Sequence, residues 1–156
     1  MSANEPDEND GYVKVCFQQG ELVETLWAKP LGQNRYGLDN SPFYAYSVSW
    51  QDIIEAVANT QDGALEFVKV LKKSGYRTVR LILHRVPIES DEGAQLLAPL
   101  LKLGCSYEAL YNKLVSVSIP PFANFAEVVE YVKSLSGQDV DWEYADPRYH
   151  ELFPEN

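Results

Sequence analysis

The chain has 156 residues, of which 46% are hydrophobic and 12% aromatic, which suffices for a packed core and argues against global disorder. Its formal net charge is −10 at pH 7, and its Lys and Arg residues are not clustered in the sequence. Both features disfavour sequence-independent binding to nucleic acids, which needs clustered basic residues against the phosphates. The acidic N-terminus is unlike a signal peptide, and no apolar run approaches the roughly 20 residues of a membrane span, so we expect a cytoplasmic protein with no membrane partner.

The first half of the chain predicts a tail and five short strands. Residues 1–11 carry four acids and no base and lack periodicity, so we expect a disordered acidic tail. Alternating apolar residues between turns rich in Gly, Asn and Asp then predict strands over residues 12–18, 22–31, 35–38, 53–57 and 64–73. A helical turn capped by Ser49 is an alternative for 53–57, and a helix is an alternative for 64–73. Five short strands indicate a small closed or half-closed barrel over residues 12–75.

After Ser74-Gly75-Tyr76 the pattern changes to a mixture of strands and helices. Strands are expected over residues 77–86, 105–111, 114–119 and 140–144. Helices are expected over 91–103 and 125–135, with Ser90 and Asn124 as N-caps and a bend at Pro99. This β-α-β-β-α-β order is the ferredoxin-like arrangement, over residues 76–147, and residues 148–156 form an acidic C-terminal tail. The predicted fold is therefore α+β, a five-stranded barrel-like half followed by a ferredoxin-like half.

Several short motifs in the first half together resemble a known bacterial family. They are Val-Lys-Val-Cys-Phe, Leu-Trp-Ala-Lys-Pro-Leu-Gly, Tyr-Gly-Leu-Asp-Asn-Ser-Pro-Phe-Tyr-Ala-Tyr, Asp-Ile-Ile-Glu-Ala and Ser-Gly-Tyr-Arg-Thr-Val-Arg. In order and spacing the chain is similar to the family catalogued as domain of unknown function 4265, strongly over residues 12–83 and more weakly to residue 147. The resemblance implies a small soluble bacterial protein, and it brings no activity, cofactor or catalytic residue with it.

The chain offers few residues for chemistry. A metal site needs several His, Cys, Asp or Glu at short spacing, whereas His84 and His150 are far apart and no Cys-x-x-Cys or His-x-x-x-His occurs. Cys16 and Cys105 are best explained as structural thiols in a reducing compartment. The glycines form neither a dinucleotide-binding nor a phosphate-binding motif. We therefore expect no metal and no cofactor, assign no catalytic residue, and favour a protein that is not an enzyme.

Two groups of residues are candidates for binding a partner. Asp139, Asp141 and Glu143 alternate, so on a strand they would share one face, as an acid–base pair or as a solvated edge. A second group is the aromatic loop that contains Phe43, Tyr44, Tyr46 and Trp50. Its side chains either form a binding surface or plug the end of the barrel. The candidate protein-binding residues are Tyr44, Tyr46, Trp50, Asp139, Asp141, Trp142, Glu143, Tyr144 and Asp146.

The excess of acid at the C-terminal end suggests a basic protein as partner. Residues 138–156 carry six acids against Arg148 and interleave them with aromatic side chains. The first hypothesis is a non-enzymatic protein-binding module, an immunity or antitoxin-like inhibitor of a basic toxin. The alternative is a ligand-binding protein or enzyme with a carboxylate-lined cleft between the two halves, using Asp39, Asp52 or the pair Asp141 and Glu143. A structural adaptor is a third possibility.

Overall fold

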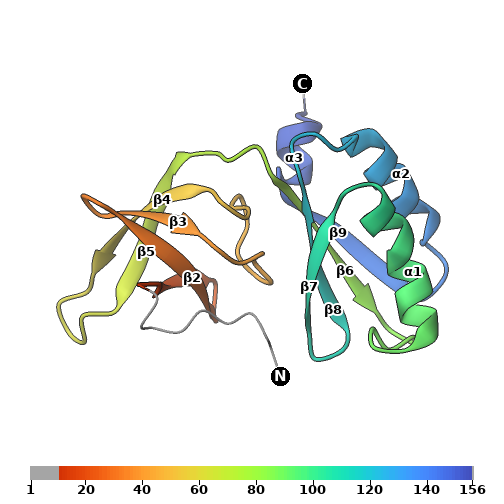
Figure 1. Ribbon diagram of the computed structural model, residues 1–156, viewed down its shortest axis with the longest axis horizontal. Coiled ribbons are helices and arrows are strands. Elements are labelled where there is room, and N and C mark those ends of the chain that lie inside the picture. The colour runs from red at the N-terminus through yellow and green to blue at the C-terminus, as the bar shows by residue number, and fades with distance from the viewer. Residues whose placement is uncertain (1–10, 156) are drawn as a thin grey trace. The chain divides into compact units, whose positions relative to one another are not determined.

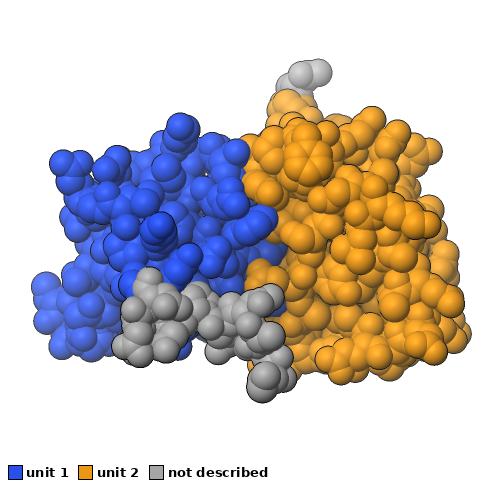
Figure 2. All heavy atoms as spheres, viewed as in Figure 1, with its two compact units in different colours: residues 1–74 blue, residues 75–156 orange. Residues whose placement is uncertain are grey.

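The computed structural model describes residues 11–155, and the chain divides into two compact units, residues 1–74 and residues 75–156. Figure 2 shows the first unit in blue and the second in orange. Within the described residues, the first unit contains only strands as regular structure, and the second combines strands with helices (Figure 1). This confirms the predicted α+β class. Except for Gly11, the tail expected at residues 1–11 lies outside the described residues.

Five strands close into a barrel in the first unit, as the sequence predicts. They are β1 (Val13–Gln19), β2 (Leu22–Gly32), β3 (Arg35–Leu38), β4 (Ile53–Ala58) and β5 (Leu65–Lys72). Consecutive strands pair antiparallel, and the barrel closes where β1 and β5 run parallel, with Val15 beside Leu65. Because β4 and β5 are strands, the helical alternatives for both segments are wrong.

The barrel core follows from the two-residue period of its strands, which sends every second side chain inward. The buried strand residues are Val15, Phe17, Leu26, Ala28, Leu38, Ile54 and Ala56. The loop of residues 39–52 adds Ala45 and Val48, which are 4% and 1% exposed, to the same core. This loop therefore packs into the barrel core and is not a loop that lies only on the surface.

The second unit has the ferredoxin-like arrangement that the sequence predicts. Its strands are β6 (Arg77–Leu83), β7 (Ser106–Leu110), β8 (Leu114–Ile119) and β9 (Val140–Asp146), and its helices are α1 (Asp91–Lys102), α2 (Phe125–Ser134) and α3 (Tyr149–Leu152). The sheet order is β7-β8-β6-β9, with all neighbours antiparallel. Figure 1 shows α1 and α2 side by side on one face of this sheet. Their apolar faces cover the buried apolar side chains of the two central strands, β6 and β8.

Both long helices begin at the expected caps. The Ser90 hydroxyl accepts a hydrogen bond from the Gly93 amide at 3.0 Å, and the Asn124 side chain accepts one from the Glu127 amide at 3.2 Å. Each bond satisfies one of the amides that the first helical turn leaves without a carbonyl partner. At the other end of α1, Gly104 has a φ of +96°, a conformation that glycine adopts without steric cost.

The larger differences from the sequence prediction in the second unit concern β6, β9 and the chain after it. β6 stops at Leu83 instead of residue 86, because its partner β9 begins at Val140, where the chain leaves the positive φ of Asp139. β9 continues to Asp146, which pairs with Thr78. Residues 149–152, expected only as part of an acidic tail, form the short helix α3.

We expect the thiol of Cys105 to resist alkylation in the folded protein. Cys105 is 5% exposed, and burial raises its pKa to about 11 from an ordinary value of 9.0. At pH 8 the reactive thiolate is then about 100-fold rarer than in the unfolded chain. Iodoacetamide followed by peptide mass spectrometry should label Cys105 at least about 100-fold more slowly in buffer than in urea. Equal rates in the two conditions would show that the thiol is accessible.

Candidate functional site

The sequence-predicted binding residues fall into two groups, one in each unit. Tyr44, Tyr46 and Trp50 belong to the loop of residues 39–52 in the first unit. The second group, from Asp139 to Asp146, covers β9 and the residue before it. The two groups are therefore parts of two separately packed structures.

A buried carboxylate that the sequence analysis did not single out fixes the loop of residues 39–52. Glu24 in β2 is 8% exposed, and its carboxylate accepts hydrogen bonds from three consecutive backbone amides, those of Phe43, Tyr44 and Ala45, at 2.5, 3.1 and 3.0 Å. A charged acceptor for three donors holds this segment in one conformation. A glutamate at an inward position of an alternating strand is the sequence signal that could have revealed it.

The carboxylates considered for a ligand site in the first unit are engaged within that unit. Asp52 is fully buried and accepts hydrogen bonds from the Ser49 amide at 2.9 Å, the Ser74 amide at 2.8 Å and the Lys73 ammonium at 2.5 Å. Asp39 accepts a hydrogen bond from the Trp50 indole at 3.3 Å. These contacts close the loop of residues 39–52 and give both aspartates a structural role.

Of the three alternating acids, Asp141 and Glu143 lie on β9, whereas Asp139 does not. Asp139 has a φ of +58° and precedes the strand, so the prediction that it shares a strand face is wrong. A residue in the left-handed region cannot continue the extended backbone of a strand. Asp141 and Glu143 do share one face, opposite the face through which Tyr144 joins the core.

Each of the three acids has a basic partner in or just after β6. The Arg80 guanidinium contacts Glu143 at 2.9 Å, and the His84 ring contacts Asp141 at 2.7 Å. A longer contact of 3.6 Å joins Arg85 to Asp139. These pairs arise because β6 and β9 are antiparallel neighbours, with Arg80 directly opposite Glu143.

A small hollow lies on this face of the sheet. We call it the acidic hollow; its volume is about 160 Å³, and its lining residues are Arg80, Ile82, Leu114, Asp141, Trp142 and Glu143. The Asp141 and Glu143 side chains are 77% and 45% exposed. The volume is below the roughly 300 Å³ at which small-molecule sites begin, so it suits a single side chain. Asp146, by contrast, is 5% exposed, and this burial removes it from the accessible acids.

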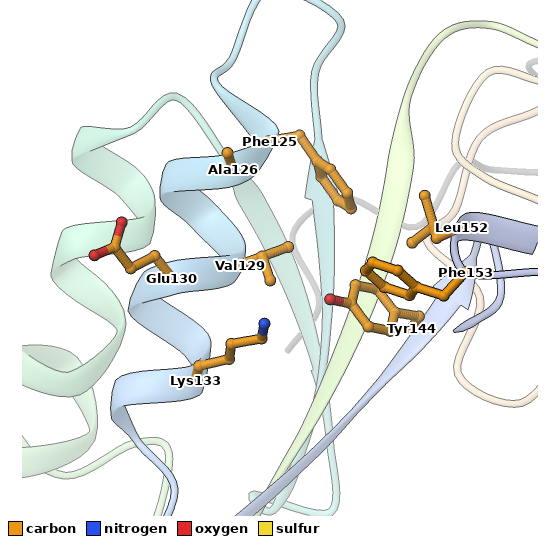
Figure 3. A pocket seen from close by; sticks show the side chains of 8 residues that line it. All are labelled: Phe125, Ala126, Val129, Glu130, Lys133, Tyr144, Leu152 and Phe153. Atoms are coloured by element: carbon orange, nitrogen blue, oxygen red, sulfur yellow. The ribbon is translucent and has the colours of Figure 1, made fainter. Parts of the chain in front are cut away.

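The opposite face of β9 borders a second, larger pocket. Tyr144 contacts the rings of Trp142, Phe125 and Phe153 at centroid distances of 5.0, 6.4 and 6.2 Å. Phe125, Tyr144 and Phe153 border a pocket of about 370 Å³ between α2, β9 and α3, shown in Figure 3. Burial, and to a lesser extent the neighbouring Tyr149, raises the pKa of the Tyr144 hydroxyl. No motif in the sequence predicts this pocket, because the helical pattern of α3 is too short to be recognised.

Among residues 11–155 no group of three or more His, Cys, Asp or Glu side chains is placed to hold a metal ion. Within the same residues no helix has the length and hydropathy that crossing a membrane requires.

Comparison with known proteins identifies the family. A family model described as a domain of unknown function (DUF4265) matches residues 24–144. The chain belongs to the DUF4265 family. This confirms the resemblance noted in the sequence, and the match reaches across both units to Tyr144.

The DUF4265 fold also occurs in a solved structure. That structure, described as a novel crystal structure of a hypothetical protein from Neisseria gonorrhoeae, is 16% identical to this chain with a TM-score of 0.71. The similarity covers 89% of this chain and 96% of the other. At that identity the likeness shows the fold alone. No curated protein matches this member of the DUF4265 family.

Proposed function

We propose that the protein is a non-enzymatic protein-binding module, an inhibitor of the immunity or antitoxin type, whose partner is a basic protein. The observation that carries this proposal is the acidic hollow. Two exposed carboxylates border it, those of Asp141 and Glu143, and Ile82, itself 37% exposed, contributes an apolar wall. A Lys or Arg side chain has the matching chemistry, an aliphatic stem that packs on apolar surface and a cationic end.

The wider charge distribution supports a basic partner. The second unit carries 12 acidic against 7 basic residues, so the ion pairs of β6 and β9 leave it with an excess of negative charge. Such an excess accelerates encounter with a positively charged protein and is screened by salt. Association should therefore slow as ionic strength rises.

A cytoplasmic location belongs to the same proposal. Neither Cys16 nor Cys105 forms a disulfide, which is the state expected of thiols in a reducing compartment.

The proposal predicts a salt-dependent partner that recognises the acidic hollow. The tagged protein would be used as bait in a lysate of its source organism at about 50 and 500 mM salt, with mass spectrometric identification of what is captured. We expect one stoichiometric basic protein. The double variant Asp139→Asn, Asp141→Asn should bind it about tenfold more weakly, because one carboxylate of the hollow and a second one just before β9 are lost. Asn suits position 139, since it tolerates a positive φ.

A matched control removes the same amount of charge elsewhere on the second unit. The double variant Glu89→Gln, Glu92→Gln alters two exposed acids and should bind the partner as the wild type does, apart from a small loss of steering. If no protein is captured at either salt concentration, the inhibitor proposal is wrong. If both double variants lose the same affinity, binding depends on net charge and not on the acidic hollow.

A further inference from the structure

The pocket between α2, β9 and α3 has features that the protein-binding proposal does not use. Its volume of about 370 Å³ lies within the range of small-molecule sites. Its apolar lining comes from Phe125, Ala126, Val129, Tyr144, Leu152 and Phe153. Figure 3 shows these side chains around one space, with Phe125 and Val129 from α2 facing Tyr144 and Phe153. Such a wall binds the apolar body of a ligand.

One polar group inside this pocket lacks a protein partner. Tyr144 is 8% exposed, and among residues 11–155 its hydroxyl makes no hydrogen bond to another side chain or to the backbone. In Figure 3 the hydroxyl oxygen points into the space below Val129. Solvent still reaches this oxygen, since no buried side-chain oxygen or nitrogen among the described residues lacks a hydrogen-bond partner, so a ligand acceptor would take the place of water on the hydroxyl. Because burial raises its pKa, the hydroxyl keeps this proton well into the alkaline range.

A cationic side chain lies on the same side of the pocket as the Tyr144 hydroxyl. Lys133 lines the pocket and forms no ion pair with any other described residue. Figure 3 shows its ammonium group turned toward the side of the Tyr144 hydroxyl, whereas the carboxylate of Glu130 points away. An ammonium and a phenol on one side of an apolar pocket are a donor pair for a carboxylate.

We propose that this pocket binds a small amphipathic carboxylate, with its apolar body against Phe125, Val129 and Phe153 and its carboxylate between Lys133 and Tyr144. The inference goes beyond the proposed protein-binding function and does not depend on it. The acidic hollow and this pocket lie on opposite faces of β9, so each can be altered without the other.

The test compares three probes that share a chain and differ in their head group. Octanoate, octanol and octylamine would be titrated into the full-length protein by calorimetry and by NMR. We expect saturable binding of octanoate, about tenfold weaker binding of octanol and no binding of octylamine, because only the carboxylate accepts from both donors. The amides that shift with octanoate should lie in α2, β9 and α3.

Two substitutions test the donors, each beside a matched control. Lys133→Gln should weaken octanoate about tenfold, whereas Lys102→Gln, in the last turn of α1, should leave it unchanged. Tyr144→Phe removes only the hydroxyl and should weaken octanoate about fivefold. Tyr111→Phe, at a side chain that is 84% exposed, should have no effect.

A third variant fills the pocket without disturbing the core. Ala126 is exposed on α2 and lines the pocket, so Ala126→Trp should abolish octanoate binding while the circular dichroism spectrum stays unchanged. Asp139→Asn, Asp141→Asn should bind octanoate as the wild type does, which separates this inference from the proposed function. Absence of saturable octanoate binding, equal binding of the three probes, or full binding by Lys133→Gln would overturn the inference.

Discussion

Gly93→Ala is expected to lower the free energy of unfolding of the second unit by about 2 kcal/mol. In the first turn of α1, a methyl group at position 93 would lie 2.3 Å from the Pro87 carbonyl oxygen and 2.5 Å from that of Ile88. Both are backbone atoms, and the segment cannot yield easily, because the Ile88 amide donates to the Asn112 carbonyl at 3.2 Å. Overpacking of this kind costs roughly 3 kcal/mol, which outweighs the gain of about 1 kcal/mol when alanine replaces glycine in a helix.

Chemical denaturation followed by circular dichroism at 222 nm measures this effect, since the helices of the described chain all lie in the second unit. Gly37→Ala in β3 is the matched control. Its new methyl group would meet only Leu31 Cδ1, at an ordinary 3.8 Å, and should change stability by less than about 0.5 kcal/mol. If Gly93→Ala raised the free energy of unfolding, the gain in helix propensity would exceed the cost of the clash, and residues 87–90 would be able to move.

Glu24→Gln is expected to destabilise the barrel by about 3 kcal/mol. The carboxylate accepts from the amides of Phe43, Tyr44 and Ala45, whereas a glutamine amide offers one oxygen and turns its own N–H groups toward the remaining donors. Hydrogen bonds to a charged group contribute about 1.5–3 kcal/mol each, and a buried donor left without an acceptor costs about as much. Part of the loss is recovered when the loop of residues 39–52 moves toward water.

The change can be followed at two levels. Fluorescence of Trp27 and Trp50 in a Trp142→Phe background reports unfolding of the first unit alone. Hydrogen exchange should accelerate at the amides of Phe43, Tyr44 and Ala45 before the rest of the barrel opens. Glu21→Gln removes the same charge at an exposed turn and should be neutral. A Glu24→Gln protein as stable as this control would show that water replaces the carboxylate at no cost.

The functional proposals rest on the two faces of one edge strand. β9 presents Asp141 and Glu143 on one face and Tyr144 on the other, and the two faces differ in charge and in apolar surface. A strand can carry two such sites because its side chains alternate. The experiments above separate the faces, since the variants of the acidic hollow and those of the pocket share no residue.

Elements with local signals can be predicted from the amino-acid sequence alone. Alternation fixed the five barrel strands, and Ser90 and Asn124 fixed the starts of the two long helices, because a cap acts within one turn of the residue that provides it. The strand and helix order then implied the ferredoxin-like sheet, since few topologies accommodate it. The family resemblance was equally a property of contiguous motifs.

Which side chains meet depends on the packing of elements that are distant in the sequence. Arg80 and Glu143 are 63 residues apart in the chain, and their ion pair exists because β6 and β9 are paired in one particular register. Glu24 binds amides about 20 residues away, and Tyr144 borders a pocket only because α2 and α3 lie beside it. Local periodicity predicts strands and helices, but it does not contain the register and packing of elements that are distant in the sequence. These contacts therefore could not be predicted from the sequence.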